Sequence, residues 1–470
     1  MKTYDKYINT SLAGINEVPH HWKSIKLKFI GNLYSGLSGK SGDDFYNPDA
    51  PLSRPYISFK NIAGNSKINP TQLDYVIINP EDVQNKVKIG DLFFLMSSEN
   101  FEDIGKAAVL DTDLEETYLN SFCRGFRINV DSFNPSFLNY LLSSGLYRQM
   151  MSIEAKGFTR INIQVGKIQN FQIFAPFSFE EQTKIAQYLD YQTSTIEKII
   201  QQKEKLIELL KQKRQAVINE AVAKGLNPKA KMKDSGVEWL GEMPMHWNFM
   251  PLKYLSSKDR GIQTGPFGTQ LNTKDYIDYG IKVLNQKTLI DEDYNSGEEY
   301  ISSEKMKELP GYEVVGGDII IGTRGSFGAK ARTTFGKCSI VPDNIPESVL
   351  HPCLIRIRLN EDFITKNYFK YYVNDSTHFL EHLLNTSNST TIEVIYGVTL
   401  KSIKFPVPPI SEQNDIVQYL DRIAGELDKI VSLELMQIDR LKEYSQSLIS
   451  EAVTGKIDVR EWQPNKQQVA

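Results

Sequence analysis

Cysteine is scarce in this chain of 470 residues, and the three that occur, Cys123, Cys338 and Cys353, are scattered. Their spacing fits neither a disulfide framework nor a metal site, and it is typical of a reducing compartment. Long apolar runs are also missing. The N-terminal segment has no apolar region like that of a signal peptide, and no stretch reaches the roughly 18 apolar residues of a membrane span. We therefore expect a soluble, cytoplasmic protein.

An excess of positive charge is missing as well, since the formal net charge is −4. Most nucleic-acid-binding proteins carry a basic domain, so any basic surface here must be local. Residues 181–233 carry 11 basic and 6 acidic side chains, whereas residues 412–470 carry 7 basic and 11 acidic ones. Opposite charge on two similar segments favours their pairing.

The composition is otherwise that of a globular protein, with 40% apolar and 24% charged residues. A chain of this length exceeds what a single hydrophobic core normally supports, so we expect at least two domains.

An internal repeat organises the chain. Near the start, the motif Glu17, Pro19, His21, Trp22, Leu27 and Lys28 recurs 225 residues later as Glu242, Pro244, His246, Trp247, Leu252 and Lys253. Residues 181–222 align without a gap to residues 412–453, with 17 identities over 42 positions. Just upstream, Ile168, Phe171 and Ile173 match Leu400, Ile403 and Phe405, which predicts a closing strand. Each repeat is thus a globular domain, a short strand and a long helix.

Heptad periodicity predicts that the two long helices pack together as an antiparallel coiled coil. The predicted seam residues are Leu189, Ile196, Leu210 and Val217 in the first helix, and Leu420, Leu427, Leu441 and Leu448 in the second. Ile185, Ile199 and Leu206 are expected to fill the complementary line of the seam. No Gly or Pro interrupts residues 180–224, so the first helix should reach about 65 Å at ~1.5 Å per residue.

The globular halves are predicted to mix helices and strands. Short β-rich runs cover 91–96 and 318–322, and one amphipathic helix is expected in each half, at 135–148 and 365–384. The predicted fold class is therefore α+β and internally duplicated, with two mixed domains separated by two long helices.

Catalytic motifs fail on inspection. The SGKS segment at 38–41 lacks the first glycine of a phosphate loop, and Asn134-Pro135-Ser136-Phe137 lacks the second proline of an amino-methyltransferase site. A turn and a helix start at Asn134 explain these two segments better.

Single chemistry-bearing residues do not form a site either. His378 and His382 lie one helical turn apart, but the acidic residue of HExxH is absent, so packed or solvated histidines are expected. Cys123 and Cys353 stand in apolar runs, where inert thiols are usual. The sequence therefore predicts no catalytic residue, no metal site and no enzyme activity in this chain.

Three segments carry a family resemblance: SGVEWLGEMPMHW at 235–247, AVAKGLNP at 221–228 and ISEAVTGKIDVREW at 449–462. Together with the order of the repeats they resemble the DNA-specificity subunits of type I restriction-modification enzymes. The resemblance covers the whole chain. It departs in the first opening motif, INEVPHHW, which is looser than the second, and in the short polar tail through Ala470.

The resemblance implies a non-catalytic role in a restriction system. In that family each variable domain is a target-recognition domain for half of a split DNA site, and the paired helices are both spacer and docking surface. Two methyltransferase subunits carry S-adenosylmethionine and the catalytic residues, and two restriction motor subunits use ATP and Mg²⁺. The implied parts are target-recognition domain 1 at 1–179, a spacer helix at 180–224, a linker at 225–234, target-recognition domain 2 at 235–410, a second spacer helix at 411–454 and a tail at 455–470.

Polar and basic residues on predicted loops are the candidates for contacts with bases and phosphates. In the first half they are Lys40, Arg54, Lys60, Asn61, Ser97, Glu99, Arg124, Arg160 and Asn162. In the second half they are Gln263, Thr264, Gln270, Gln286, Lys287, Arg324, Lys330 and Arg332. For each, a solvated surface side chain is the simple alternative.

A second function from a different class remains open, namely a protein-assembly scaffold whose duplicated domains bind polypeptides instead of DNA. A steep loss of DNA binding with rising salt distinguishes the two, because phosphate contacts release counterions. If DNA is read, half-site centres should lie roughly one helical turn, about 10 to 11 base pairs, apart. The bases recognised do not follow from the sequence.

Overall fold

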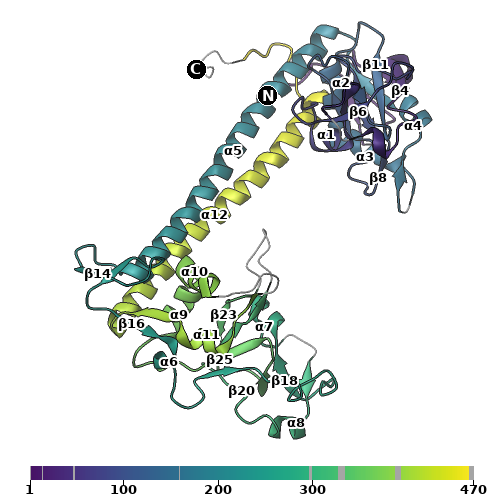
Figure 1. Ribbon diagram of the computed structural model, residues 1–470. Helices are drawn as coiled ribbons and strands as arrows, with labels where there is room; N and C mark the ends of the chain where they lie inside the picture. The colour runs from purple at the N-terminus through teal and green to yellow at the C-terminus, as the bar shows by residue number, and fades with distance from the viewer. Residues whose placement is uncertain are drawn as a thin grey trace. The chain divides into compact units, whose positions relative to one another are not determined.

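The computed structural model describes residues 2–12, 14–45, 48–157, 159–295, 299–325, 334–386 and 393–464. The chain divides into two compact units (Figure 1). Unit 1 comprises Met1–Lys203 and Leu435–Ala470, and unit 2 comprises Glu204–Glu434. Each unit therefore holds one globular domain with a part of both long helices.

Unit 1 is built on two small sheets. An antiparallel sheet has the order β4-β11-β7-β9, formed by Gly31–Ser35, Cys123–Ile128, Leu92–Leu95 and Ala107–Val109. A second sheet has the order β10-β5-β6, formed by Tyr118–Leu119, Ser53–Ile57 and Leu73–Ile77, and its β10-β5 pair is parallel. Two-stranded pairings join β1 (Tyr7–Asn9) to β2 (Glu17–Pro19), β3 (Lys23–Lys26) to β13 (Gln172–Ala175), and β8 (Ser97–Ser98) to β12 (Ile161–Asn162).

Unit 2 repeats this plan, which confirms the predicted duplication. Its antiparallel sheet β17-β25-β21-β23 consists of Ile262–Thr264, Leu354–Ile357, Ile319–Gly322 and Cys338–Ile340. The second sheet, β19-β18-β24-β20, consists of Tyr300–Ile301, Ile281–Leu284, Ser348–Leu350 and Glu313–Val314, and its β18-β24 pair is parallel. The two-stranded pairings recur as β14 (Met232–Asp234) with β15 (Glu242–Pro244), β16 (Asn248–Pro251) with β27 (Lys404–Val407), and β22 (Arg324–Gly325) with β26 (Glu393–Val394).

An ion pair with a buried aspartate joins strands of the antiparallel sheet in each unit. Asp91, which precedes β7, is 1% exposed and accepts hydrogen bonds from Arg127 Nε at 2.9 Å and from the Tyr34 hydroxyl at 2.7 Å. Asp318, which precedes β21, is 3% exposed and accepts one from Arg358 Nε at 2.8 Å. A buried carboxylate is tolerated only with such partners, so the two pairs hold the neighbouring strands in register.

The predicted amphipathic helices are interrupted. In unit 1, α2 (Pro135–Ser143) and α3 (Gly145–Ile153) meet at Ser144, whose backbone is extended. In unit 2, the helical segments Lys366–Lys370 (α9) and Tyr371–Asp375 end before Ser376, and α10 (Thr377–Thr386) follows. Both serine hydroxyls donate to carbonyls of the preceding turn, and this competes with continuation of the helix. Asn134 caps α2 by accepting from Phe137 N at 3.0 Å, as predicted.

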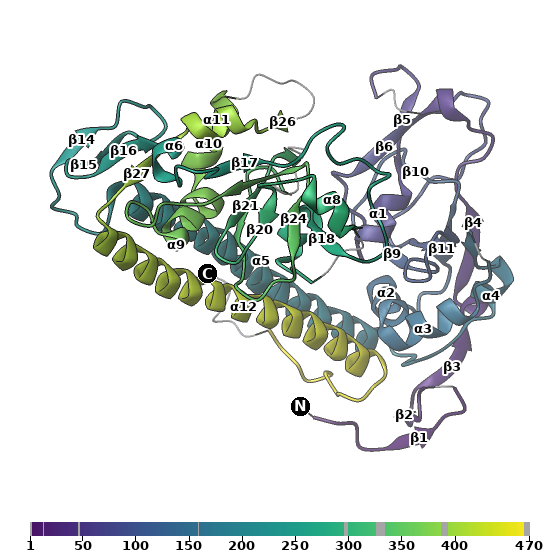
Figure 2. The same ribbon diagram turned by 90° about the horizontal axis from the view of Figure 1, so that it is seen from below.

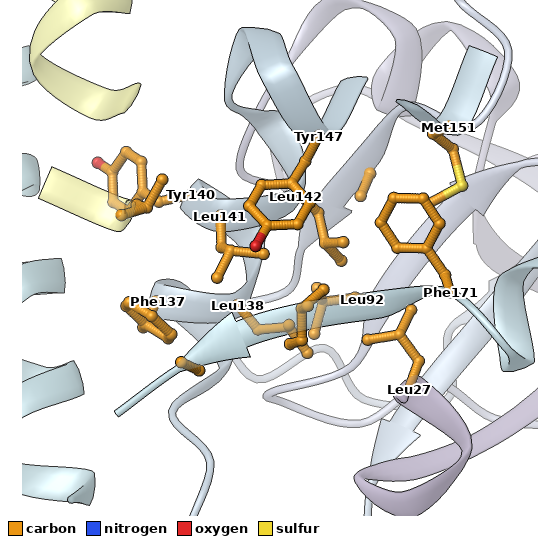
Figure 3. Packing of buried hydrophobic residues seen from close by; sticks show 14 of the residues in the cluster. Leu27, Leu92, Phe137, Leu138, Tyr140, Leu141, Leu142, Tyr147, Met151 and Phe171 are labelled. Atoms are coloured by element: carbon orange, nitrogen blue, oxygen red, sulfur yellow. The ribbon is translucent and has the colours of Figure 1, made fainter. Parts of the chain in front are cut away.

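Helices α2 and α3 bury their apolar faces against the globular domain of unit 1. Figure 3 shows side chains of α2 and α3 meeting Leu27, Leu92 and Phe171 in one apolar cluster.

The strand predicted around Ile168 is shorter than expected. Ile168 lies in α4 (Val165–Gln169), as its counterpart Leu400 lies in α11 (Gly397–Ser402), and the strands β13 and β27 begin only afterwards.

The long helices are α5 (Phe179–Lys224) and α12 (Ile410–Val453), which pack side by side (Figures 1 and 2). Within unit 1, Lys203 Nζ donates to Gln437 at 2.5 Å, and within unit 2, Arg214 Nε lies 3.2 Å from Asp428. From Lys203 to Arg214 the residue number on α5 rises, whereas the residue number of the contacted side chain on α12 falls from Gln437 to Asp428. The two helices therefore run antiparallel.

The predicted seam is mostly correct. Leu189, Ile196, Leu420, Leu427 and Leu448 are buried, whereas Leu210, Val217 and Leu441 are half-buried. In the complementary line of α5, Ile185 is buried as predicted, but the prediction was wrong for the two positions that follow it.

Those two positions, Ile199 and Leu206, are exposed at 36% and 41%, whereas Ile207 and Ala221 are buried. In this part of α5 the second line of buried residues lies four positions after the first line, as Ala221 follows Val217. The prediction had placed it three positions after, as Ile199 follows Ile196. One residue is a turn of about 100° around a helix with ~3.6 residues per turn, so this difference moves a side chain from the surface into the seam.

A glutamine fastens α5 to its own domain. Gln182 is fully buried, its Nε2 donates to the carbonyls of Ser132 at 2.9 Å and Pro176 at 2.7 Å, and its Oε1 accepts from Asn134 N at 2.8 Å. These contacts join the start of the helix to the closing strand and to the cap of α2. They explain the glutamine of the repeated EQ segment.

The same fastening occurs in unit 2. Gln413 Nε2 donates to the carbonyls of Phe363 at 2.7 Å and Pro408 at 2.9 Å, and its Oε1 accepts from Thr365 N at 2.8 Å. We call the contacts of Gln182 and Gln413 the glutamine latches.

Replacing Gln182 with Leu should lower the free energy of unfolding of unit 1 by about 2 to 4 kcal/mol, because buried backbone groups lose their partners. Hydrogen exchange resolved by segment would report faster exchange in α2 and β13 and unchanged exchange in unit 2. Gln413→Leu should give the reverse pattern, and Gln187→Leu, at an exposed site of the same helix, should change neither. Equal effects of Gln182→Leu and Gln187→Leu would contradict the latch.

Candidate nucleic-acid interface

A two-stranded pairing lies just beyond an inner strand of each antiparallel sheet. In unit 1, β8 follows β7 and pairs with β12, so Ser97 lies opposite Asn162. In unit 2, β22 follows β21 and pairs with β26, so Arg324 lies opposite Val394. Ser97 and Arg324 are therefore structural counterparts, and both were predicted as contacts from the sequence.

The β8-β12 pairing gathers several predicted residues of unit 1 at the surface. Arg160 and Asn162 are exposed, and Asn162 Nδ2 donates to the Arg160 carbonyl at 3.1 Å. The Arg160 guanidinium lies over the ring of Phe122, 5.0 Å from its centroid. Glu99 is exposed just after β8. Amide, guanidinium and hydroxyl groups of this kind are those that bind base edges and phosphates.

A second pair of equivalent residues, Lys60 and Lys287, lies in the first turn of a short helix in each unit. Lys60 is the second residue of α1 (Phe59–Gly64), which follows β5, and Lys287 is the second residue of α7 (Gln286–Asp291), which follows β18. Both lysines are exposed. Repetition of an exposed ammonium at one place of a duplicated fold is what two equivalent phosphate contacts require.

In unit 2 the predicted residues partly converge. Gln286 Nε2 donates to the carbonyl of exposed Arg324 at 2.8 Å, so these two residues and Lys287 lie close together. Gln263 and Thr264 are half-buried on β17, where the Gln263 amide donates to the Thr264 carbonyl at 3.0 Å.

Three further residues of unit 2 were predicted as contacts. Gln270 is exposed and accepts from the Tyr312 hydroxyl at 3.1 Å. Lys330 and Arg332 lie outside the described residues.

Two predicted residues of unit 1 have structural roles instead. Asn61 is 1% exposed, and its Nδ2 donates to the carbonyls of Asn69 and Gln72. The side chain of Lys40 is 4% exposed and pairs with Asp82, whose carboxyl pKa this hydrogen bond lowers. Both side chains stabilise loops, so the structure argues against them as contacts. A loop-stabilising Asn looks the same as a base-reading one in a sequence.

Two arginines are held by neighbouring groups but keep an exposed part. Arg54 Nε donates to Glu116 at 2.7 Å, and the hydrogen bonds from Lys86 and Arg54 lower the pKa of that carboxyl. Arg124 is half-buried and donates to the Cys123 carbonyl at 3.1 Å. Contact of Arg54 and Arg124 with DNA stays a prediction.

A profile of the family described as the type I restriction modification DNA specificity domain matches residues 19–209 and 262–437. These two matches cover more than half of the chain, one in each repeat. The chain belongs to this family.

Curated relatives extend the match over nearly the full length of the specificity subunit. A putative type I restriction enzyme MjaX specificity subunit of Methanocaldococcus jannaschii is 26% identical over 96% of this chain and 97% of its own length. The type I restriction enzyme EcoKI specificity subunit of Escherichia coli K12 is 24% identical over 94% of this chain and 90% of its own length.

Solved structures share the fold of the specificity subunit. A chain from a study of complex assembly and conformational transition of the type I R-M system superposes with a TM-score of 0.69 at 16% identity, covering 94% of this chain and 99% of its own. The HsdS subunit from Thermoanaerobacter tengcongensis gives 0.57 at 17% identity, with coverage of 94% and 99%.

In a type I enzyme the specificity subunit is the non-catalytic one, and the contacts of the remaining chemistry-bearing residues fit that role. His378 Nδ1 lies 3.0 Å from the Trp239 carbonyl, and the ring of His382 packs against Trp239. Burial raises the pKa of the Cys123 thiol to about 12, whereas Cys353 is only half-buried although it stands in an apolar run. Across the described ranges, no cluster of His, Cys, Asp or Glu could hold a metal ion.

None of the helices in the described part of the specificity subunit has the length and apolar character needed to cross a membrane.

Exposed aromatic residues were missed by the sequence analysis. Phe122 is 50% exposed beside Arg160. Phe29 and Tyr254 are exposed counterparts, each under the ammonium of the preceding Lys28 or Lys253. The recurrence of the two lysines was visible in the opening motif, but exposure was not.

Lys60 and Asn61 are adjacent and provide a matched test of the specificity subunit. Lys60→Ala should leave thermal unfolding unchanged, weaken DNA binding by the reconstituted methyltransferase complex, and reduce the salt dependence by about one phosphate contact. Asn61→Ala should destabilise the chain by about 1 to 3 kcal/mol, because buried backbone groups lose a partner. A loss of stability with Lys60→Ala, or an unchanged salt slope, would contradict this assignment.

Proposed function

We propose that this specificity subunit reads a bipartite DNA site, with one half-site for each globular domain. The domains correspond to residues 1–179 and 235–410, the helices to 180–224 and 411–454, the linker to 225–234 and the tail to 455–470. The observation that carries the proposal is the repetition of polar residues at matching places, half-buried Ser97 with exposed Arg324 and exposed Lys60 with exposed Lys287.

Duplication suits a double-stranded target. Two similar domains related by an approximate two-fold axis can meet the two antiparallel DNA strands in equivalent ways. Phosphate contacts from lysines such as Lys60 position each domain, and the side chains around β8-β12 and β22-β26 contact base edges.

The partners we propose are double-stranded DNA, two methyltransferase subunits and, through these, two restriction motor subunits. S-adenosylmethionine, ATP and Mg²⁺ then belong to the partner subunits. Exposed apolar side chains on the long helices support a docking role, namely Ile199, Leu435 and Met436 in unit 1 and Leu206, Leu209, Ile430 and Leu433 in unit 2. Apolar side chains at such positions are typical of a protein interface.

Exchange of residues 1–175 for the same region of a relative should change one half of the recognised site and leave the other half unchanged. The reason is that each domain has its own opening motif and its own latch. Sequencing of DNA selected by the reconstituted complex measures both halves at once. Changes in both halves would refute one-domain, one-half-site reading.

We further propose that the helix pair sets the unread spacer between the half-sites. Inserting one heptad into each helix, after Lys203 and after Glu434, keeps the seam in register and adds about 10 Å at ~1.5 Å per residue. At ~3.4 Å per base pair, the spacer should grow by about three base pairs while both half-sites stay the same.

Methylation sequencing of a strain that carries both insertions measures the spacer. A seven-residue insertion in α5 alone is the control, because it breaks the pairing of the two helices and should abolish activity. An unchanged spacer with full activity in the double insertion would refute the ruler.

A further inference from the structure

The two units differ at one pair of equivalent tyrosines. Tyr188 and Tyr419 occupy the same place in the repeated QYLD segment of α5 and α12. In unit 1, the Tyr188 ring packs edge-on against the indole of Trp462, with centroids 5.4 Å apart, and the tyrosine is 5% exposed. Tyr191 contacts the same indole at 5.5 Å. In unit 2, Tyr419 is only half-buried.

Tyr419 lines a cavity of about 440 Å³ in unit 2. Val217, Leu226 and Pro228 supply apolar walls beside the tyrosine ring, and Glu220 and Glu242 supply carboxylates. Cavities of this size are typical of sites that enclose a ligand group. All these residues belong to unit 2, so the cavity lies within one compact body.

In unit 1 the C-terminal segment of the chain covers the equivalent tyrosine, Tyr188. After α12 the backbone turns, Trp462 N donates to the Val459 carbonyl at 3.0 Å, and Asp458 N donates to the Lys2 carbonyl at 2.9 Å. This segment places the indole on Tyr188. In unit 2 the chain after α5 has the sequence GLNPKAK at 225–231 and runs directly into β14, so it offers no aromatic residue.

We propose that the cavity beside Tyr419 receives a tryptophan side chain carried by a polypeptide segment of a partner subunit. The side chain that packs on the equivalent tyrosine in unit 1 is the tryptophan Trp462, and tryptophan dominates the energetics of many protein interfaces. The two carboxylates of the lining outnumber its one ammonium, that of Lys224, which favours a basic residue near the tryptophan. The C-terminal segment likewise has a basic residue, Arg460, two positions before Trp462. The site concerns assembly and goes beyond the proposed reading of DNA.

The probe is a peptide of residues 456–464, KIDVREWQP, titrated into the full-length chain by calorimetry. We expect a single site, and at least about tenfold weaker binding for the same peptide with alanine in place of tryptophan. Tyr419→Ala in the chain should weaken binding by a similar factor. Equal helix content by circular dichroism would show that this variant folds.

Charge reversal gives a matched pair that leaves the core intact. Glu220→Lys should weaken peptide binding several-fold, whereas Glu451→Lys, at the equivalent position of unit 1, should leave it unchanged. A peptide with a photoreactive tryptophan analogue should crosslink to residues 217–228 or to Tyr419. No binding by the wild-type chain, binding indifferent to both Tyr419→Ala and Glu220→Lys, or crosslinks confined to unit 1 would each overturn the proposal.

Discussion

The interaction on which both units depend is made by a glutamate at the start of each long helix. Glu181 is 6% exposed and accepts hydrogen bonds from Trp22 Nε1 at 3.1 Å and from the Tyr4 hydroxyl at 2.9 Å, and His21 Nε2 lies 2.9 Å away. In unit 2, Trp247 Nε1 donates to half-buried Glu412 at 3.0 Å, and His246 Nε2 lies 2.8 Å away. A carboxylate withdrawn from water is stable only with such partners, so the opening motif of each domain must meet its own helix.

This constraint separates what is fixed from what can vary. The opening motif, the closing strand and the first turn of the helix are joined by the glutamate and by the glutamine latch. The residues that carry the candidate contacts in unit 1 lie outside that frame, on the short strands β8 and β12, on the short helix α1 and on the loops beside them. Loops on a rigid scaffold are where recognition is normally placed, because they can change without loss of the fold. A specificity subunit needs this division.

Much of the fold could be predicted because the sequence contains two copies of the same repeat. Comparison of the repeats located the domains and the long helices, and heptad spacing placed Leu189 and Leu420 in the seam. Periodicity did not separate Leu206 from Ile207, since both are apolar neighbours and only packing decides which of the two enters the seam. The breaks at Ser144 and Ser376 were missed because serine occurs inside helices as well as at their ends.

The interface could be predicted less completely. The predicted contacts Lys60 and Lys287 lie exposed at matching places, whereas buried Asn61 was not recognised as a loop-stabilising residue and exposed Phe122 was not considered. Both failures have the same cause, because exposure depends on tertiary contacts that a local sequence pattern does not contain.

The central claim is that this chain alone chooses the DNA sequence on which a type I enzyme acts. A methylation map of the host genome, compared between the wild-type strain and one that lacks only this chain, tests it most directly. We predict one bipartite motif, with two short specific halves around an unread spacer, that is methylated in the wild type and unmodified in the deletion strain. Persistence of that motif in the deletion strain, or loss of a motif without a spacer, would contradict the account.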